Sequence, residues 1–332
     1  MKEPNIVKKI NGKTGELSNE KILGICIFIR LRFKTPLHPP MLNVYELLIS
    51  HPEHFKQLKV KDLLFVHYHC PQDNEKLDIY TNYNFITYTI SGERVIIRPG
   101  KTFSLTEGKC VFVKKGAYSQ QRFHEADWCV LVFFMPDSYL RQFIKEYRTK
   151  LSSKTGANQP LDVVLDVNVT DTTKAFFYGM LPYLMQETPP SEDLLELKFR
   201  ELLFNILSDS ANAELLAYIS SMEDQQKPPL PDIMEANYMF NLSLEEYSKI
   251  SHRSLASFKR EFSELFKTTP GKWLTQKRLH YAHLLLRTSK KHVNEIAYES
   301  GFENSTHFSR LFKEKFGAAP LQFRKENLPL NA

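Results

Sequence analysis

The sequence predicts an α+β protein in which a small β-barrel or sandwich precedes an all-helical region. Between residues 62 and 135, apolar and polar residues alternate, and turn-forming pairs such as Ser91-Gly92 and Pro99-Gly100 divide the segment into short strands. From residue 232 onward, apolar residues recur every three or four positions, as on one face of a helix. Two kinds of periodicity in a chain of 332 residues are expected for two structural units.

Three helices are expected between these two regions. The first begins with Asp137 as its cap, and the second spans 176–185 and is expected to break at Pro182. The third spans 191–208, with Ser191 at its N-cap. Its apolar face is wide, so this helix is expected to pack against more than one partner.

The most informative motif spans residues 296–313 and predicts a helix-turn-helix. Ile296 and Ala297 end a first helix, and Gly301 supplies the sharp turn that follows. Phe302 fills the gap between the two helices, and the second helix then buries a stripe of phenylalanines. Its other face carries small hydrogen-bond donors and an arginine, which suits the major groove of DNA.

A weaker copy of this pattern occupies residues 242–265. Ser254 is expected to cap its second helix, which should bury Phe258, Phe262 and Leu265. An amphipathic helix over 270–287 lies between the two copies and would hold them rigidly apart. Recognition helices about one DNA turn apart, roughly 34 Å, could then enter successive major grooves.

The helical region carries a set of residues with distinctive spacing: Arg278, Leu279, Ala282, Leu285, Leu286, Ile296, Ala297, Gly301, Phe302, Phe308, Phe312, Lys313, Gly317, Pro320 and Arg324. With this set, residues 232–325 resemble the AraC/XylS family of bacterial transcription regulators. The resemblance implies base-reading side chains on both recognition helices, with Lys313 as a further DNA contact. These side chains are Ala256, Ser257, Lys259 and Arg260 in the first helix, and Ser305, Thr306, His307, Ser309 and Arg310 in the second.

The first copy departs from the family pattern at two positions. Ser248 stands where a small alanine is usual, and His252 stands where the turn glycine is usual. The serine is expected to cost little. His252 requires either a positive φ or a different turn, which affects the orientation of the first recognition helix.

The charge distribution agrees with a DNA-binding C-terminal region. From residue 231 onward there are 16 Lys and Arg against 11 Asp and Glu, whereas residues 41–230 contain 20 against 24. The positive charge therefore lies where the motifs place DNA.

In this family context, the strands resemble a cupin-type sensor, with Glu107–Gly116 as a characteristic turn-strand-turn. The expected organisation is a cupin-like sensor and dimerisation domain at 41–221, a linker at 222–231 and a double helix-turn-helix domain at 232–332. Residues 1–40 are rich in lysine and are expected to be disordered, or to precede a true start at Met41. A basic arm that adds nonspecific DNA affinity is the alternative.

The resemblance also implies that the helices after the barrel form a dimer. Residues on the apolar face of 191–208 are the candidates for this interface, and packing within one chain is the alternative for them. They are Leu195, Phe199, Leu202 and Ile206.

A metal site is not expected, and neither is a cofactor or catalysis. The His67-Tyr68-His69 motif has the HxH spacing of a cupin metal site, but it precedes the hairpin, and the nearest further ligands are His124 and Glu125. A metal-dependent cupin enzyme with a DNA-binding appendage is the alternative from another functional class.

The expected function is sequence-specific transcription regulation in the cytoplasm by a homodimer on double-stranded DNA that recruits RNA polymerase. The N-terminal region would respond to a small-molecule effector or, alternatively, to a protein partner. The apolar stretch Ile22–Ile29 is too short to span a membrane, and four scattered cysteines are typical of free thiols in a reducing compartment.

Overall fold

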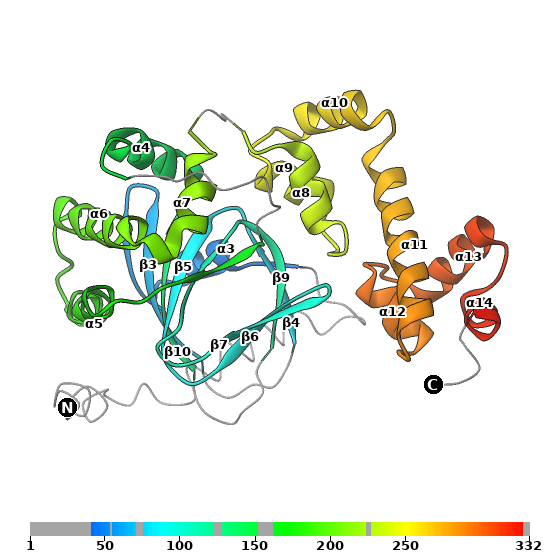
Figure 1. Cartoon of the computed structure of the whole chain (residues 1–332), viewed down its shortest axis with the longest axis horizontal. Coiled ribbons are helices and arrows are strands. Elements are labelled where there is room, and N and C mark those ends of the chain that lie inside the picture. The colour runs from blue at the N-terminus through cyan, green and yellow to red at the C-terminus, as the bar shows by residue number, and fades with distance from the viewer. Residues whose placement is uncertain are drawn as a thin grey trace.

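The strands of the N-terminal half form two facing sheets, and helices follow in the C-terminal half (Figure 1). The computed structural model describes residues 41–53, 55–70, 76–121, 128–151, 162–223 and 227–327. The segment 1–40, for which disorder or a later start was expected, lies outside the described residues. The predicted α+β class, a barrel-like pair of sheets followed by an all-helical region, is confirmed.

One sheet has five strands in the order β1-β4-β9-β6-β7. Its strands pair antiparallel, except that β1 pairs with β4 in parallel. The strands are β1 Leu42–Asn43, β4 Leu77–Thr81, β6 Arg94–Arg98, β7 Lys101–Leu105 and β9 Gly116–Gln121.

The other sheet has six antiparallel strands in the order β11-β8-β5-β10-β3-β2. Its central strands β5 and β10 are almost continuously buried, as expected for strands covered on both faces. The strands are β2 Lys56–Val60, β3 Leu63–Cys70, β5 Asn84–Ser91, β8 Cys110–Val113, β10 Trp128–Met135 and β11 Val164–Val167.

Alternation along each strand divides the six-stranded sheet between two cores. On β5, Phe85 faces the other sheet, where its ring lies 6.0 Å from that of Tyr118. Its neighbours Ile86 and Tyr88 face outward, and the Tyr88 ring stacks on Phe177 at 4.3 Å. The aromatic residues of the strands therefore fill both the barrel interior and a second core outside it.

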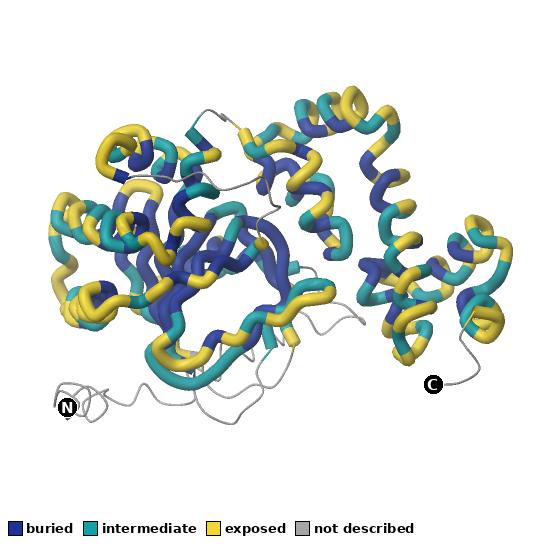
Figure 2. Tube along the Cα trace, in the orientation of Figure 1, coloured by how far each residue is buried: buried dark blue, intermediate teal, exposed yellow. Residues whose placement is uncertain are grey.

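Helices cover the outer face of the six-stranded sheet and close this second core (Figure 1). Figure 2 shows that their inward sides are buried and their outward sides exposed, as expected for amphipathic helices. A short helix, α3 Val44–Ser50, contributes Tyr45 to the barrel interior. The covering helices are α4 Asp137–Tyr147, α5 Asp171–Met185, α6 Glu192–Ser208, the 3₁₀ helix η1 Ser210–Asn212 and α7 Ala213–Ser220.

Two expectations about these helices were wrong. Asp137 does not cap α4, because its carboxylate forms a buried ion pair with Lys115 at 2.5 Å. The second helix is not broken at Pro182, since α5 runs from Asp171 through the proline to Met185. The proline removes one backbone hydrogen bond, but burial of Leu181 on the same turn favours the helix. The expected cap at Ser191 of α6 is confirmed, as its hydroxyl accepts a bond from the Leu194 N–H at 3.3 Å.

The C-terminal half is helical as predicted, and α11 spans Pro270–Thr288 where a helix over 270–287 was expected. The first helix, α8, already begins at Leu230, within the segment expected to be a linker. No described helix has both the length and the apolar character needed to cross a membrane. The remaining helices are α8 Leu230–Asn237, α9 Leu244–Ile250, α10 Leu255–Phe266, α12 Val293–Glu299, α13 Ser305–Phe316 and α14 Pro320–Asn327.

Replacing Gly301 by alanine should destabilise the C-terminal half. Gly301 has a φ of +87°, and an added Cβ would lie 2.8 Å from both the Arg278 Nε and the Met239 carbonyl oxygen. Strain of this kind costs of the order of 1–3 kcal/mol. We expect Gly301→Ala to lower the melting temperature, measured by circular dichroism.

Gly271→Ala is the matched control. Gly271 lies in α11, and an added Cβ would have no atom within 4 Å. Alanine there should be neutral or stabilise by about 0.5 kcal/mol. Equal melting temperatures for the two variants would contradict the proposed strain at Gly301.

Candidate nucleic-acid interface

The first helix-turn-helix consists of α9 and α10. Ser243 begins α9 with a reciprocal cap: its hydroxyl accepts from the Glu246 N–H at 3.2 Å, and the Glu246 carboxylate accepts from the Ser243 N–H at 2.6 Å. Ser254 caps α10, as predicted. Phe258 and Phe262 are fully buried, which fixes the side of α10 that faces the protein.

The turn between these helices adopts the strained geometry expected for a histidine at the glycine position. His252 has a φ of +53°, so the expectation of a positive φ is confirmed. Ser248 fits at the alanine position because its hydroxyl donates to the Glu245 carbonyl at 2.8 Å. Arg253 donates to both carboxylate oxygens of Glu261, at 2.8 and 2.5 Å, and so ties the turn to α10.

The outward face of α10 carries the side chains predicted to read bases. Ala256, Lys259 and Arg260 are exposed, and Ser257 is half-buried. This face points away from the buried phenylalanines of the same helix, so the four side chains share one accessible surface.

Leu265 is not buried as predicted, since 53% of it is exposed. Phe266 takes the position near the core at the end of α10. Its ring lies 4.4 Å from that of Phe262 and 5.3 Å from that of Trp273. The larger ring covers the end of the core and leaves Leu265 on the surface.

The second helix-turn-helix consists of α12 and α13 and follows the sequence motif closely. Ile296 and Ala297 are fully buried, Gly301 makes the turn with its positive φ, and Phe302 is 8% exposed between the helices. Asn304 caps α13 by accepting from the His307 N–H at 2.9 Å. The predicted geometry of this unit is therefore present residue by residue.

The outward face of α13 presents the second set of predicted contacts. Thr306, His307, Arg310 and Lys313 are exposed, whereas Ser305 and Ser309 are half-buried. The Ser309 hydroxyl donates to the Ser305 carbonyl at 2.8 Å, which leaves its oxygen free only as an acceptor.

The basic groups on both faces are available to DNA. Within the described ranges, no carboxylate forms an ion pair with Lys259, Arg260, Arg310 or Lys313. Exposed cations without a protein partner can neutralise phosphates or donate to base edges.

The helix α11 joins the two units into one body. Its 19 residues span about 28 Å. Trp273 and Leu274 pack on the first unit, while Leu279, Ala282 and Leu286 pack on the second. The length of this connecting helix is comparable to one turn of DNA, roughly 34 Å.

Arg278 of α11 binds the connection between α8 and α9 to α11 by hydrogen bonds. Its guanidinium donates to the Tyr238 carbonyl at 2.7 Å and to the Phe240 carbonyl at 2.8 Å. An Asn241 to Glu303 hydrogen bond also bridges the two units. Spacing alone marked Arg278 as a family residue, but its bonding role is visible only in the folded chain.

The side chains expected at a dimer interface lie inside the protomer. The outer core between α6 and the six-stranded sheet holds them, and the Phe199 ring lies 5.5 Å from that of Phe65. The exposed apolar residue of this helix is Leu197, which is 64% exposed. Of the two interpretations, packing within the chain accounts for the wide apolar face. The buried side chains are Leu195, Phe199, Leu202 and Ile206.

The HxH motif points away from the barrel interior. His67 and His69 share the outer face of β3 with Phe65, because residues two apart lie on the same side of a strand. The His67 Nε2 lies 3.0 Å from the Cys129 Sγ, and burial, together with the nearby His69, lowers the pKa of His67 to about 4. The described residues contain no group of three potential metal ligands, and His124 and Glu125 lie outside them.

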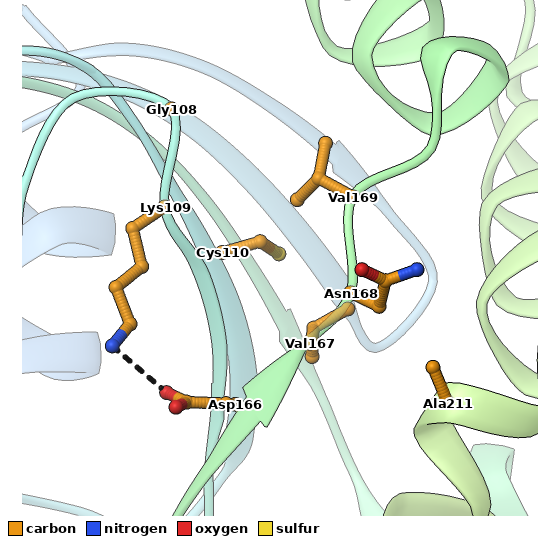
Figure 3. Close-up of a pocket in the computed structure, with 8 residues that line it drawn as sticks. All are labelled: Gly108, Lys109, Cys110, Asp166, Val167, Asn168, Val169 and Ala211. Atoms are coloured by element: carbon orange, nitrogen blue, oxygen red, sulfur yellow. Dashed lines mark ion pairs between the residues drawn. The ribbon is translucent and has the colours of Figure 1, made fainter.

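A shallow depression of about 440 Å³ lies beside β8 and β11 (Figure 3). The Lys109 Nζ lies 3.1 Å from the Asp166 Oδ1 on its rim, so these two charges neutralise each other. Its other lining residues are Gly108, Cys110, Val167, Asn168, Val169 and Ala211. With its charged groups paired, this depression offers no net charge to a ligand.

Comparison with known proteins covers both halves of the chain. Residues 84–218 match the ExsA N-terminal regulatory domain, and residues 247–326 match a helix-turn-helix domain family. The thermoregulatory protein LcrF of Yersinia pestis is 26% identical over 226 residues, which are 68% of this chain and 83% of LcrF.

Two further relatives align over a similar extent. The virulence regulon transcriptional activator VirF of Yersinia enterocolitica is 27% identical over 225 residues, 68% of this chain and 82% of VirF. The transcriptional regulator ExsA of Pseudomonas aeruginosa is 25% identical over 236 residues, 71% of this chain and 84% of ExsA. These relatives are transcription regulators and not enzymes. The chain has a regulatory half followed by paired helix-turn-helix units, and it belongs to the AraC/XylS family of DNA-binding transcription regulators.

Proposed function

We propose that this regulator activates transcription by inserting α10 and α13 into successive major grooves of its operator. The observation that carries the proposal is the pair of exposed polar faces joined by one continuous helix. Each face has an arginine that forms no ion pair with a carboxylate among the described residues. The proposed base-reading residues are Ala256, Ser257, Lys259, Arg260, Ser305, Thr306, His307, Ser309 and Arg310, with Lys313 on a phosphate.

Activation would require contact with RNA polymerase, and the name of VirF as a transcriptional activator supports this direction. We assign the sensor to residues 41–221 and DNA binding to 232–332, with 222–231 between them. A homodimer on DNA would place further recognition helices on the operator, through a surface other than the buried face of α6. Because the proposed target is DNA, we expect the protein in the cytoplasm.

We further propose that a small molecule acts on the barrel interior. Thr87 and Thr89 of β5 carry buried hydroxyls, and Trp128 on β10 carries a buried indole N–H. Within the described part of the chain, none of these three groups has a hydrogen-bond partner. All three side chains lie on strand positions that alternate with the outward-facing Tyr88 and Leu131. Unpartnered buried groups favour a bound molecule that hydrogen-bonds to them.

A protein partner is the alternative signal. Packed aromatic side chains occupy much of the described barrel interior. For example, the ring centroids of Phe85 and Phe134 lie 5.2 Å apart. A filled interior leaves less room for a ligand and would favour control through the outer surface. The two alternatives differ in whether low-molecular-mass compounds reach Trp128.

Replacing Arg310 by alanine should reduce sequence discrimination. The loss of a bidentate contact to a base costs about 1–3 kcal/mol against the cognate site and little against random DNA. We would measure the dissociation constants for operator and scrambled duplexes by fluorescence anisotropy at fixed salt. Equal losses on both duplexes would refute a base-reading role for Arg310.

Lys313→Ala should weaken binding evenly across sequences and reduce the slope of log K against log salt by about 1. Lys174→Ala, which removes an exposed lysine from α5, is the control for a general loss of charge. A Lys313→Ala variant that loses discrimination and keeps its salt slope would contradict a phosphate contact.

Thr87→Val should abolish the response to a small-molecule effector without loss of stability. Valine has nearly the same shape, and removal of an unpartnered buried hydroxyl is neutral or stabilising. In a Trp273→Phe background Trp128 is the single tryptophan, so its emission reports on the barrel interior. We expect a low-molecular-mass cell extract to change this emission, and Thr87→Val to prevent the change.

An extract that leaves the Trp128 emission unchanged, at concentrations that alter DNA binding, would place the effector elsewhere. An extract with no effect on either measurement would favour the protein partner. The melting temperature of Thr87→Val, expected at or above that of the parent, serves as the control for folding.

A further inference from the structure

Within the described residues, the barrel shares a buried cluster with the first helix-turn-helix and none with the second. Tyr80 and Ala117 of the barrel share a buried cluster with Leu230, Met234 and Tyr247 of α8 and α9. The buried cluster of the second unit contains only residues from α11 onward. Figure 1 agrees, since α8 and α9 lie beside the strands and α12 to α14 lie at the far end of α11.

One side of this contact is a set of hydrogen bonds between side chains and the backbone. The Asn237 Oδ1 accepts from the Ala117 N–H at 2.8 Å, and the Asn237 amide donates to the Ile233 carbonyl at 2.8 Å. The Arg98 guanidinium donates to the carbonyls of Ala117 and Ala236, and so bridges β9 and α8. These bonds fix the end of α8 on the first residues of β9.

Asn237 fits against the barrel because residue 116 is a glycine. Gly116 has a φ of +138°, and a Cβ there would lie 2.8 Å from the Asn237 Oδ1. Tyr247 of α9 then donates to the Asn237 carbonyl at 2.8 Å. Through Asn237, this hydrogen bond links strand β9 of the barrel to α9 of the first helix-turn-helix.

The other side of the contact is made by the turn that precedes α10. The His252 Nε2 lies 3.7 Å from the Asp137 Oδ2, and the same oxygen lies 2.5 Å from the Lys115 Nζ. The Asp137 Oδ1 accepts from the Asn84 amide at 2.7 Å, which holds the carboxylate in place. Lys115 directly precedes Gly116, so both sides of the contact start from the barrel residues 115–117.

The choice of histidine in this turn is informative. A φ of +53° is unfavourable for a residue with a side chain, and glycine would adopt it without strain. Strained residues persist where the surrounding structure compensates for them. The strained residue is also the one whose side chain lies beside the Asp137 carboxylate at the start of α4.

Docking does not mask the recognition face of α10. Ala256, Lys259 and Arg260 remain exposed while the turn and α8 contact the barrel. The contact therefore sets the orientation of α10 and leaves it open to DNA.

We infer that residues 115–117 of the barrel position the first recognition helix, α10, through His252 and Asn237. His252 is a positioning residue in this scheme and touches no base. The inference rests on the proposed function, in which both helices read DNA. It adds that the signal enters through the first unit, while α11 keeps the second unit out of direct contact with the barrel.

The test uses the full-length chain and a duplex selected by the parent protein from random sequence. Two derived duplexes each keep one half-site and scramble the other, and the half-site that depends on Arg260 is assigned to the first unit. We expect His252→Gly to weaken binding at least fivefold on the duplex with the first half-site, and to change binding less than twofold on the other. His252→Ala should act in the same direction.

The glycine variant separates positioning from turn geometry. Glycine adopts the positive φ more readily than histidine. If residue 252 were needed only for the turn, His252→Gly would therefore keep DNA binding and His252→Ala would lose it. That pattern would overturn the inference. Tighter DNA binding by His252→Gly than by the parent would also overturn it, because such a result would mean that contact with the barrel masks α10. Lys267→Gly, which relieves a φ of +52° at the end of α10, is the matched control and should affect both duplexes equally.

A second measurement tests the contact itself. Asp137→Asn should also weaken binding to the first half-site, and adding His252→Gly to it should cause little further loss, because the two residues act through one contact. Fully additive losses would overturn the coupling. If the parent selects no two-part duplex, the proposed function fails and the inference fails with it, whereas a selected duplex with no effect of His252→Gly overturns the inference alone.

Discussion

The buried ion pair between Lys115 and Asp137 lies where the barrel, the helical layer and the first helix-turn-helix meet. Removing two charges from water costs several kcal/mol per ion, so such a pair persists only with further hydrogen bonds. Asn84 supplies them, donating to the Asp137 carboxylate at 2.7 Å and accepting from the Lys115 N–H at 3.1 Å. Burial would raise the pKa of Asp137, but Lys115 and His252 hold it below its ordinary value. The start of α4 and the start of β9 are fixed to one another by this pair.

Five of the arginines in this protein fall into two groups that burial separates. Arg253 and Arg278 donate to carbonyls or to a carboxylate inside the C-terminal half, and burial lowers the pKa of Arg278. Arg98 bridges the barrel and α8 in the same way, and burial lowers its pKa to about 10. Arg260 and Arg310 are exposed. Residue type and net charge alone could not separate the arginines that bond inside the protein from those proposed to contact DNA.

The strands illustrate how far periodicity carries a prediction. Alternation and turn pairs predicted a barrel over residues 62–135, and the strands are there. They did not predict that the six-stranded sheet is buried on both faces, with Tyr88 and Phe112 under helices and Phe85 inside the barrel. Both faces of such a strand are apolar, so the sequence does not distinguish the one that points inward. The outward direction of His67 is a consequence of the same register.

The sequence by itself determined the features that depend on neighbours within a few residues. The caps at Ser191 and Ser254, the turn at Gly301 and the phenylalanine stripe of α13 all follow from local hydrogen bonds and helical spacing. These features sufficed for the family and for DNA binding.

Only the tertiary structure decided the features whose partners are distant along the chain. Asp137 looked like a helix cap, but its partner is Lys115, 22 residues earlier. His252 looked like an imperfect turn residue, but it lies beside that same carboxylate. The apolar face of α6 suited either a dimer surface or packing within the chain, and the sheet covers it. Such outcomes depend on which surfaces pack together when the chain folds. Residue spacing along the sequence does not determine contacts between residues that are distant in the chain.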